Sequence, residues 1–156
     1  MNMNRRLLLK GTATAGVVVV AAASGLLTPR RVLAAWPKAA FEADNLADTM
    51  AAIGGSAEPV DSSDITIKAP DIAENGAVVP ISVDAAIDKV EKISIIAEHN
   101  PAPLAATFEF GPGAQGFVST RIKMGKTSNV IALVQADGKL YQASKEVKVT
   151  IGGCGG

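Results

Sequence analysis

The chain has 156 residues, of which 15 are basic and 15 are acidic, so its formal net charge is zero. Without an excess of positive charge there is no electrostatic basis for binding nucleic acid or an anionic membrane surface. The sequence contains one histidine and one cysteine, which excludes an internal disulfide framework and a clustered set of metal ligands. No glycine-rich phosphate loop opens a predicted helix either, so we expect this chain to bind no metal or cofactor of its own.

The N-terminal segment has the layout of a twin-arginine export signal. The pair Arg5-Arg6 begins a basic region, residues 11–29 are uncharged, and small residues lead to a cleavage-like site after Ala34 or Ala35. The alternative is a membrane anchor, because 19 uncharged residues could just span a bilayer. Glycines, threonines and a serine make the stretch only mildly apolar. We therefore predict that the segment is removed and that the mature protein is periplasmic, without a stable membrane anchor.

Removal of residues 1–35 would take away five basic residues and no acidic one. Ten basic and fifteen acidic residues would remain, a net charge of −5. A mature chain of about 120 residues is long enough for one domain with its own core. Proteins sent by the twin-arginine route are usually exported folded, commonly because they hold a cofactor or a pre-assembled partner. Since the residues for a cofactor are missing, we expect a second subunit to bind before export.

Residues 36–53 are predicted to form one amphipathic helix. Pro37 suits its first turn, and apolar residues recur at three- and four-residue intervals, which places them on one face. Gly54-Gly55 is expected to end the helix. This face could cover one end of its own domain or dock on a partner, and the sequence leaves both open. The apolar residues are Ala43, Leu46, Ala47, Met50 and Ile53.

Beyond the helix the apolar residues alternate with a period of two, which is typical of strands. Tight-turn signals stand at Asn75-Gly76 and Asp137-Gly138, and Pro80 indicates an edge strand or a bulge. Short strands at spacings of about ten residues predict a mainly β fold, an immunoglobulin-like antiparallel β-sandwich that with the helix occupies residues 36–151. The expected strands are 65–67, 78–83, 90–97, 104–110, 118–124, 130–135 and 140–151.

His99 and several scattered carboxylates are weak candidates for catalysis. His99 stands where a strand enters a proline-rich turn, and a solvated or backbone-bonded loop histidine is a better interpretation than a ligand or a base. The glycines of residues 111–116 lack the strand-to-helix context that phosphate binding requires. We assign none of these groups a catalytic role and predict that the protein is not an enzyme.

The single cysteine, Cys154, is the strongest functional signal. It lies in a tail, residues 152–156, that reads Gly-Gly-Cys-Gly-Gly. Free cysteine is normally buried as a small hydrophobe, whereas flanking glycines leave this thiol without neighbouring Cβ atoms and with little restriction of the backbone. We expect the tail to be a flexible arm that presents the thiol to other proteins. Because no Lys, Arg or His lies near it in sequence, activation of the thiol must come from the pocket that receives it.

These features together resemble the SoxY family, the sulfur-compound carriers of the periplasmic thiosulfate-oxidising (Sox) system. The resemblance spans essentially the full length and is most specific in the tail. It includes the twin-arginine signal, the helix after Trp36, the stretch Ile72–Pro80 and the Asn100-Pro101 turn. The resemblance implies that the covalent attachment site is Cys154 and that its swinging arm consists of Gly152, Gly153, Gly155 and Gly156.

The resemblance also implies partners and a reaction sequence. The family pairs with SoxZ as a heterodimer. A haem c enzyme, SoxXA, joins thiosulfate to the cysteine as an S-thiosulfonate, and a manganese hydrolase, SoxB, releases sulfate and leaves a persulfide. The outer sulfur is then oxidised further, by SoxCD where present, or transferred to storage. Haem and manganese belong to these partner enzymes, and a disulfide-linked homodimer through Cys154 is expected as a side product.

Two other classes fit parts of the sequence. The terminal Gly155-Gly156 is also found in ubiquitin-like sulfur carriers, but those are cytosolic domains fed by ATP-dependent adenylation, which conflicts with an export signal. The second alternative is an immunoglobulin-like periplasmic binding module whose cysteine merely tethers it to another chain.

Overall fold

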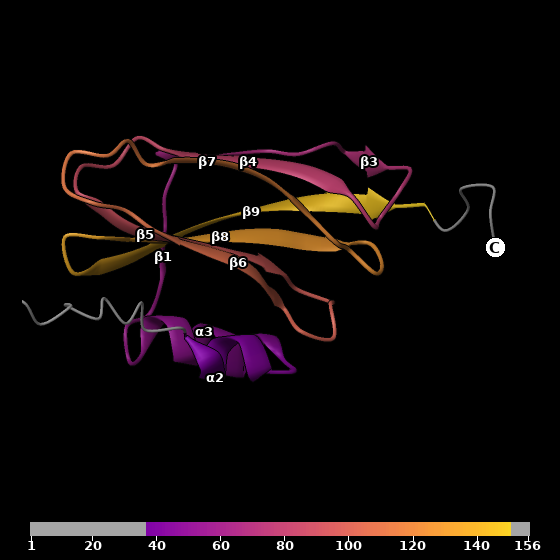
Figure 1. The fold of residues 1–156 in the computed structure, drawn as a ribbon, viewed down its shortest axis with the longest axis horizontal. Helices are drawn as coiled ribbons and strands as arrows, with labels where there is room; N and C mark the ends of the chain where they lie inside the picture. Colours follow the sequence, from indigo (N-terminus) through magenta and orange to yellow (C-terminus); the bar gives the residue numbers. More distant parts are fainter. Residues whose placement is uncertain (1–36, 151–156) are drawn as a thin grey trace, which may run out of the picture. The chain divides into compact units, whose positions relative to one another are not determined.

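The computed structural model describes residues 37–150 and confirms the predicted mainly β fold with two sheets and a helical N-terminal part (Figure 1). The helices are α2 (Lys38–Glu42) and α3 (Leu46–Gly54). The strands are β1 (Val60–Asp61), β2 (Ile65–Lys68), β3 (Ile72–Ala73), β4 (Val79–Ala85), β5 (Val90–Ala97), β6 (Leu104–Glu109), β7 (Phe117–Ile122), β8 (Ser128–Ala136) and β9 (Lys139–Val149).

The two sheets are stacked as a sandwich. The larger sheet has the order β1-β9-β8-β5-β6, and β3 also pairs with β9, while the smaller sheet has the order β2-β4-β7. All pairs are antiparallel except those of β1 and β3, which run parallel to β9 near its beginning and near its end. In Figure 1, β4 and β7 form one layer, β5, β8 and β9 form the next, and the helices lie beyond the second layer.

The main core fills the space between the two sheets. Alternate residues of each strand point inward, as the period of two predicts, and most of them are fully buried branched aliphatic side chains. Burial of each such side chain contributes about 1.5–3 kcal/mol to folding. They include Val79, Ile81 and Val83 of β4, Ile93 and Ile95 of β5, Val130 and Val134 of β8, and Val147 of β9.

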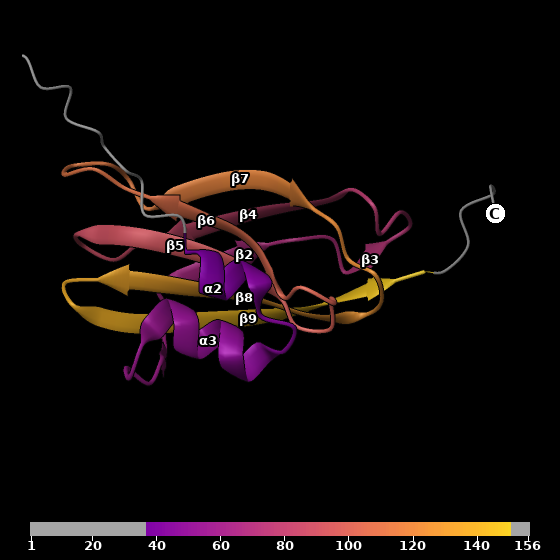
Figure 2. The ribbon, with the colours of Figure 1, turned by 60° about the horizontal axis from the view of Figure 1, so that its bottom comes forward.

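A second core lies between the helices and the outer face of the larger sheet (Figure 2). Because of it, β5 and β8 are buried on both faces, which explains their nearly continuous apolar sequences. Ile96, Ile131 and Leu133 contribute from the sheet, and Leu46 and Met50 pack on them from α3. The apolar face of the helices therefore covers its own domain, which was one of the two possibilities that the sequence left open.

The prediction of one helix over residues 36–53 is wrong, because two short helices occupy this segment. Asn45 separates them: its side-chain Oδ1 accepts a hydrogen bond from the Asp48 N–H at 2.9 Å and so caps the start of α3. Asparagine competes with the helical backbone and favours such a cap over a position inside a helix. Gly55, with φ 62°, ends α3 as the sequence predicts. In the predicted apolar stripe, Ala47 is exposed, and Thr49 is buried in its place.

Pro80 does not mark an edge strand or a bulge, since β4 is the central strand of the smaller sheet and pairs with β7 without a register shift. The sheet tolerates the proline because β2 is short. Its last residue, Lys68, lies opposite Ser82, so Pro80 is beyond the end of β2 and has a neighbouring strand only on the side of β7. The missing N–H therefore leaves the β2–β4 ladder intact.

Candidate functional site

The predicted attachment site Cys154 and the glycines Gly152, Gly153, Gly155 and Gly156 lie outside the described residues. The described part of the chain ends at Thr150, one residue after β9, so the structure shows what the tail is attached to. We call the segments around the end of β9, residues 71–78, 99–100, 123–127 and 148–150, the tail root.

Hydrogen bonds hold the end of β9 from both sides. Three successive backbone N–H groups donate to two other segments of the chain, because two of the acceptors belong to β3 or the residue before it and the third is Thr127. The bonds run from the Lys148 N to the Asp71 O (3.0 Å), from the Val149 N to the Thr127 Oγ1 (2.9 Å), and from the Thr150 N to the Ala73 O (3.1 Å). Because each of these donors has a partner, the strand is held in place up to Thr150.

The turn between β3 and β4 closes on the tail root at Gly76. The Met124 N–H donates to the Gly76 carbonyl at 2.7 Å. A Cβ on residue 76 would overlap the Met124 carbonyl oxygen and would lie 2.8 Å from the Val149 Cγ1. Only glycine allows this close approach of the turn to the last residue of β9. The turn itself is fixed by Asn75, whose Oδ1 accepts from the Ala77 N–H at 2.9 Å.

Asn100 fixes the segment that leads from β7 to β8. Its Nδ2 donates to the Lys123 carbonyl at 2.6 Å, and its Oδ1 accepts from the Gly125 N–H at 3.0 Å. His99 is exposed, and its Nδ1 lies 3.2 Å from the Thr127 carbonyl. The prediction of a loop histidine bonded to backbone is therefore confirmed. Through these two hydrogen bonds, Asn100 holds the loop whose Thr127 side chain accepts a hydrogen bond from β9.

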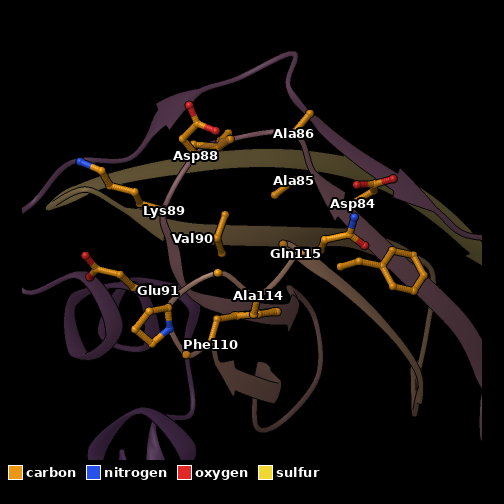
Figure 3. Close-up of a pocket in the computed structure, with 16 residues that line it drawn as sticks. Asp84, Ala85, Ala86, Asp88, Lys89, Val90, Glu91, Phe110, Ala114 and Gln115 are labelled. Carbon is orange, nitrogen blue, oxygen red and sulfur yellow. The ribbon is translucent and has the colours of Figure 1, made fainter.

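A hollow of about 1050 Å³ lies at the other end of the larger sheet (Figure 3). It is lined by residues 84–91, which connect β4 to β5, and by residues 110–117, which connect β6 to β7. Val90, one of its lining residues, pairs with Ala136 at the last position of β8, whereas the tail root meets the first. The hollow is thus separated from the tail root by the length of β8.

The hollow is open and bears more negative than positive charge. Lys89, its one lining cation, donates from Nζ to the Asp137 Oδ1 at 3.0 Å, and this hydrogen bond raises the pKa of Lys89 above its usual value. Neither histidine nor cysteine lines it. Its carboxylates are Asp84, Asp88 and Glu91.

Two further observations concern residues 37–150. No three His, Cys, Asp or Glu side chains in this part of the chain gather in a group that could hold a metal ion. None of the helices described here is both long and apolar enough to cross a membrane.

Sequence reasoning missed the tail root as a site. The stretch Ile72–Pro80 and the Asn100-Pro101 turn carried the family resemblance, but the sequence assigned them no role. The structure brings both to the end of β9, where Gly76 and Asn100 make the contacts described above. Thr127 carried no signal at all, because its role depends on a single long-range hydrogen bond to the Val149 N–H.

The described chain is a two-sheet β-sandwich whose last strand is fixed up to the point where a cysteine-bearing segment follows. The model of the family described as sulfur oxidation protein SoxY matches residues 50–154. The chain belongs to the SoxY family. The matched region includes the whole tail root and reaches Cys154.

A solved structure supports this assignment. The sulfur carrier protein SoxY from Chlorobium limicola f. thiosulfatophilum is 48% identical, with a TM-score of 0.63, over 69% of this chain and 97% of that one. A superoxide reductase (neelaredoxin) from Ignicoccus hospitalis is 22% identical, with a TM-score of 0.49, over 55% and 80% of the two chains. The human F-spondin reeler domain is 14% identical, with a TM-score of 0.43, over 62% and 96%. The similarity to the last two structures is too low to support any argument about function. A search among curated proteins finds no match.

Proposed function

We propose that this protein is a sulfur carrier of the Sox system that holds thiosulfate-derived sulfur covalently on Cys154. The observation that carries the proposal is the family match over residues 50–154, together with 48% identity to a solved sulfur carrier protein SoxY. The tail root supports it, because a carrier needs a firm body from which a short reactive segment can extend. The thiol is the one group in the sequence that can form a reversible bond to sulfur.

The loading step joins the Cys154 sulfur to the outer sulfur of thiosulfate. The new S–S bond forms as the thiol loses its proton and the two sulfurs together lose two electrons, which the haem c partner accepts. Hydrolysis then breaks the bond between the outer sulfur and the sulfonate. Water supplies an oxygen to the sulfonate, which leaves as sulfate, and the carrier keeps a persulfide. The hydrolysis consumes no electrons.

In this proposal the protein supplies no catalytic group of its own and depends on partners for each step. SoxZ is the stable second subunit, and SoxXA, SoxB and, where present, SoxCD are transient partners in the periplasm. Export by the twin-arginine route would allow the two subunits to fold and associate before they leave the cytoplasm.

The direct test is mass spectrometry of the protein from cells grown on thiosulfate. A carrier shows Cys154 peptides that have gained a thiosulfonate group or extra sulfur atoms. A binding module tethered by its cysteine shows only an inter-chain disulfide, and a ubiquitin-like carrier shows modification of the Gly156 carboxylate. Either of the last two patterns, without adducts on the thiol, contradicts the proposal.

Replacing Gly153 with valine is expected to slow turnover by partner enzymes while the thiol stays intact. A β-branched side chain restricts the backbone next to the cysteine and adds width to the arm that must enter a narrow channel. The rate of thiosulfate loading is the measurement, and alkylation of Cys154 by a small thiol reagent is the control. Normal loading of the Gly153→Val variant would show that the narrowness of the arm is unimportant.

The purified protein is expected to form disulfide-linked dimers through Cys154 when reductant is absent. An unpaired thiol in an oxidising medium pairs with another molecule unless the fold shields it. Electrophoresis without reducing agent, after exposure to air, measures the dimer. A preparation that stays entirely monomeric under these conditions would show that the thiol is shielded.

A further inference from the structure

We propose that five side chains around the tail root form a docking collar for the enzyme that loads Cys154. The collar consists of Ile72, Val78, Lys123, Lys126 and Lys148. Its partner is an enzyme surface with an apolar patch and a rim of carboxylates around the opening that receives the tail. This inference rests on the proposed carrier function and adds to it the surface by which the carrier is recognised.

The short distance along the chain from Thr150 to Cys154 limits how far the loading enzyme can lie from the collar. Four residues, fully extended, span at most about 14 Å. Thr150 is fixed to β3 by its hydrogen bond to the Ala73 carbonyl. The deeper the active centre lies below its enzyme's surface, the closer that surface must come to Thr150, and a centre near the limit of this reach brings the surface against the residues around Thr150. In register, Ile72 lies beside Lys148, two residues before Thr150.

Exposed apolar side chains are present at this end of the sandwich, as they also are toward the other end, at Val60 and Phe117. Four large hydrophobic side chains of the described residues are strongly exposed, and two of them, Ile72 (57%) and Val78 (51%), belong to the segment that holds the end of β9. Their backbone is fixed by the β3–β9 pairing and by the hydrogen bond from the Val78 N–H to the Asn75 carbonyl at 3.2 Å. A preorganised apolar contact of this kind costs little conformational entropy when a partner binds.

The three lysines supply the polar rim that surrounds such a contact in protein interfaces. Lys123, Lys126 and Lys148 are exposed and take no part in the ion pairs found within residues 37–150. The neighbouring Lys145 differs, because Asp71 lies 3.0 Å from its Nζ and neutralises it. Apart from Asp71, which is used in this pair, the nearby carboxylates in the sequence are Glu74 on the tail root and Glu146, two residues before Lys148. The lysines outnumber these two acids, so the collar favours a partner with negative charge.

The opposite end of the sandwich has the opposite charge. The hollow there is lined by three carboxylates and by a lysine that is already paired. A domain with its positive charge beside the tail and its negative charge at the far end turns toward an anionic surface with the tail leading. Such a charge distribution acts mainly on the association rate, and its effect on that rate becomes smaller as salt is added.

Matched variants at the two ends of the larger sheet test the collar. Val60 is the control for Ile72, because both are exposed residues of two-residue strands that run parallel to β9 at its two ends. Lys139 is the control for Lys126, because the two lie just beyond opposite ends of β8. The variants are Ile72→Asp with Val60→Asp, and Lys126→Glu with Lys139→Glu.

The measurement is kcat/KM for loading of thiosulfate onto Cys154 by the purified haem c loading enzyme, at low and at high salt, read by mass spectrometry. We expect Ile72→Asp and Lys126→Glu to lower kcat/KM by about tenfold at low salt and the two controls to change it by less than about twofold. The salt dependence should become weaker in Lys126→Glu and stay unchanged in Lys139→Glu. All variants should react equally with a small thiol reagent.

Each result decides the proposal. Loading of the collar variants at the rate of their controls, with normal loading of the unmodified protein, overturns the collar and leaves the carrier function intact. Equal slowing of all four variants also overturns it, because the effect would then not be local. If the unmodified protein takes up no thiosulfate, the carrier function fails and the collar with it. Ile72→Ser and Val60→Ser repeat the comparison if an aspartate variant does not fold.

Discussion

Replacing Cys154 with serine is expected to abolish sulfur carriage while the folded body stays as stable as before. A hydroxyl oxygen cannot form the S–S bond that loading requires, so the loss should be complete. The substitution lies outside residues 37–150 and removes none of the contacts described for them, so we expect a change in the free energy of unfolding of less than about 0.5 kcal/mol. Urea denaturation measures the stability, and the thiosulfate-dependent mass gain measures the loading.

A double variant, Cys154→Ser with Gly152→Cys, separates the presence of a thiol from its position. It restores a thiol but brings it two residues closer to the sandwich, which shortens the maximum reach by about 7 Å. We expect this variant to react with a small thiol reagent and not to be loaded by the partner enzyme. Sulfur adducts on Cys154→Ser would contradict the attachment site. Full loading of the double variant would instead contradict a role for the length of the arm.

The elements that the sequence predicted well are those specified by local signals. Asp137-Gly138 is one example, because a hairpin of this kind needs positive φ at both turn residues. The observed φ values are 49° for Asp137 and 72° for Gly138. The strands 90–97 and 65–67 were also predicted within one residue, since alternating or continuous branched side chains between turn residues favour strands in any context.

The elements that the sequence did not predict depend on partners far away in the chain. β1 and β3 have two residues each, too few to show a period, and they exist because β9 offers an edge to pair with.

The break between α2 and α3 was missed because the apolar spacing continued through it. Asn45 as a cap was the available signal, and the periodicity obscured it.

The residues of the candidate site also fall into those that the sequence singles out and those that only the fold brings together. The glycine neighbours of Cys154 led to its prediction as the attachment site, and this prediction concerns a residue outside the described part of the chain. The tail root could not be recognised, because Gly76, Asn100 and Thr127 come from separate segments and meet only in the folded protein. Contacts between residues 22 to 48 positions apart leave no periodic trace in a single sequence.

Gly76 gives the second large effect, on the stability of the tail root. Its replacement by alanine is expected to lower the free energy of unfolding by about 1–3 kcal/mol, the usual cost of inserting a methyl group where there is no space. The added Cβ would overlap the Met124 carbonyl and press on the Val149 side chain at 2.8 Å. The turn would have to move away from β9 and weaken the hydrogen bond from the Met124 N–H to the Gly76 carbonyl.

Gly125→Ala is the matched control, because Gly125 belongs to the same tail root. The nearest atom to a Cβ there is the Asn100 Oδ1 at 3.8 Å, an ordinary contact, so we expect a change of less than about 0.5 kcal/mol. Urea denaturation compares the two variants. Hydrogen exchange then shows where the change occurs: in Gly76→Ala the amides of Val149 and Thr150 should exchange faster, since their acceptors lie on segments that the turn supports. Equal stability of the two variants would mean that the turn is free to shift, and the end of β9 would not be the fixed base from which the tail extends.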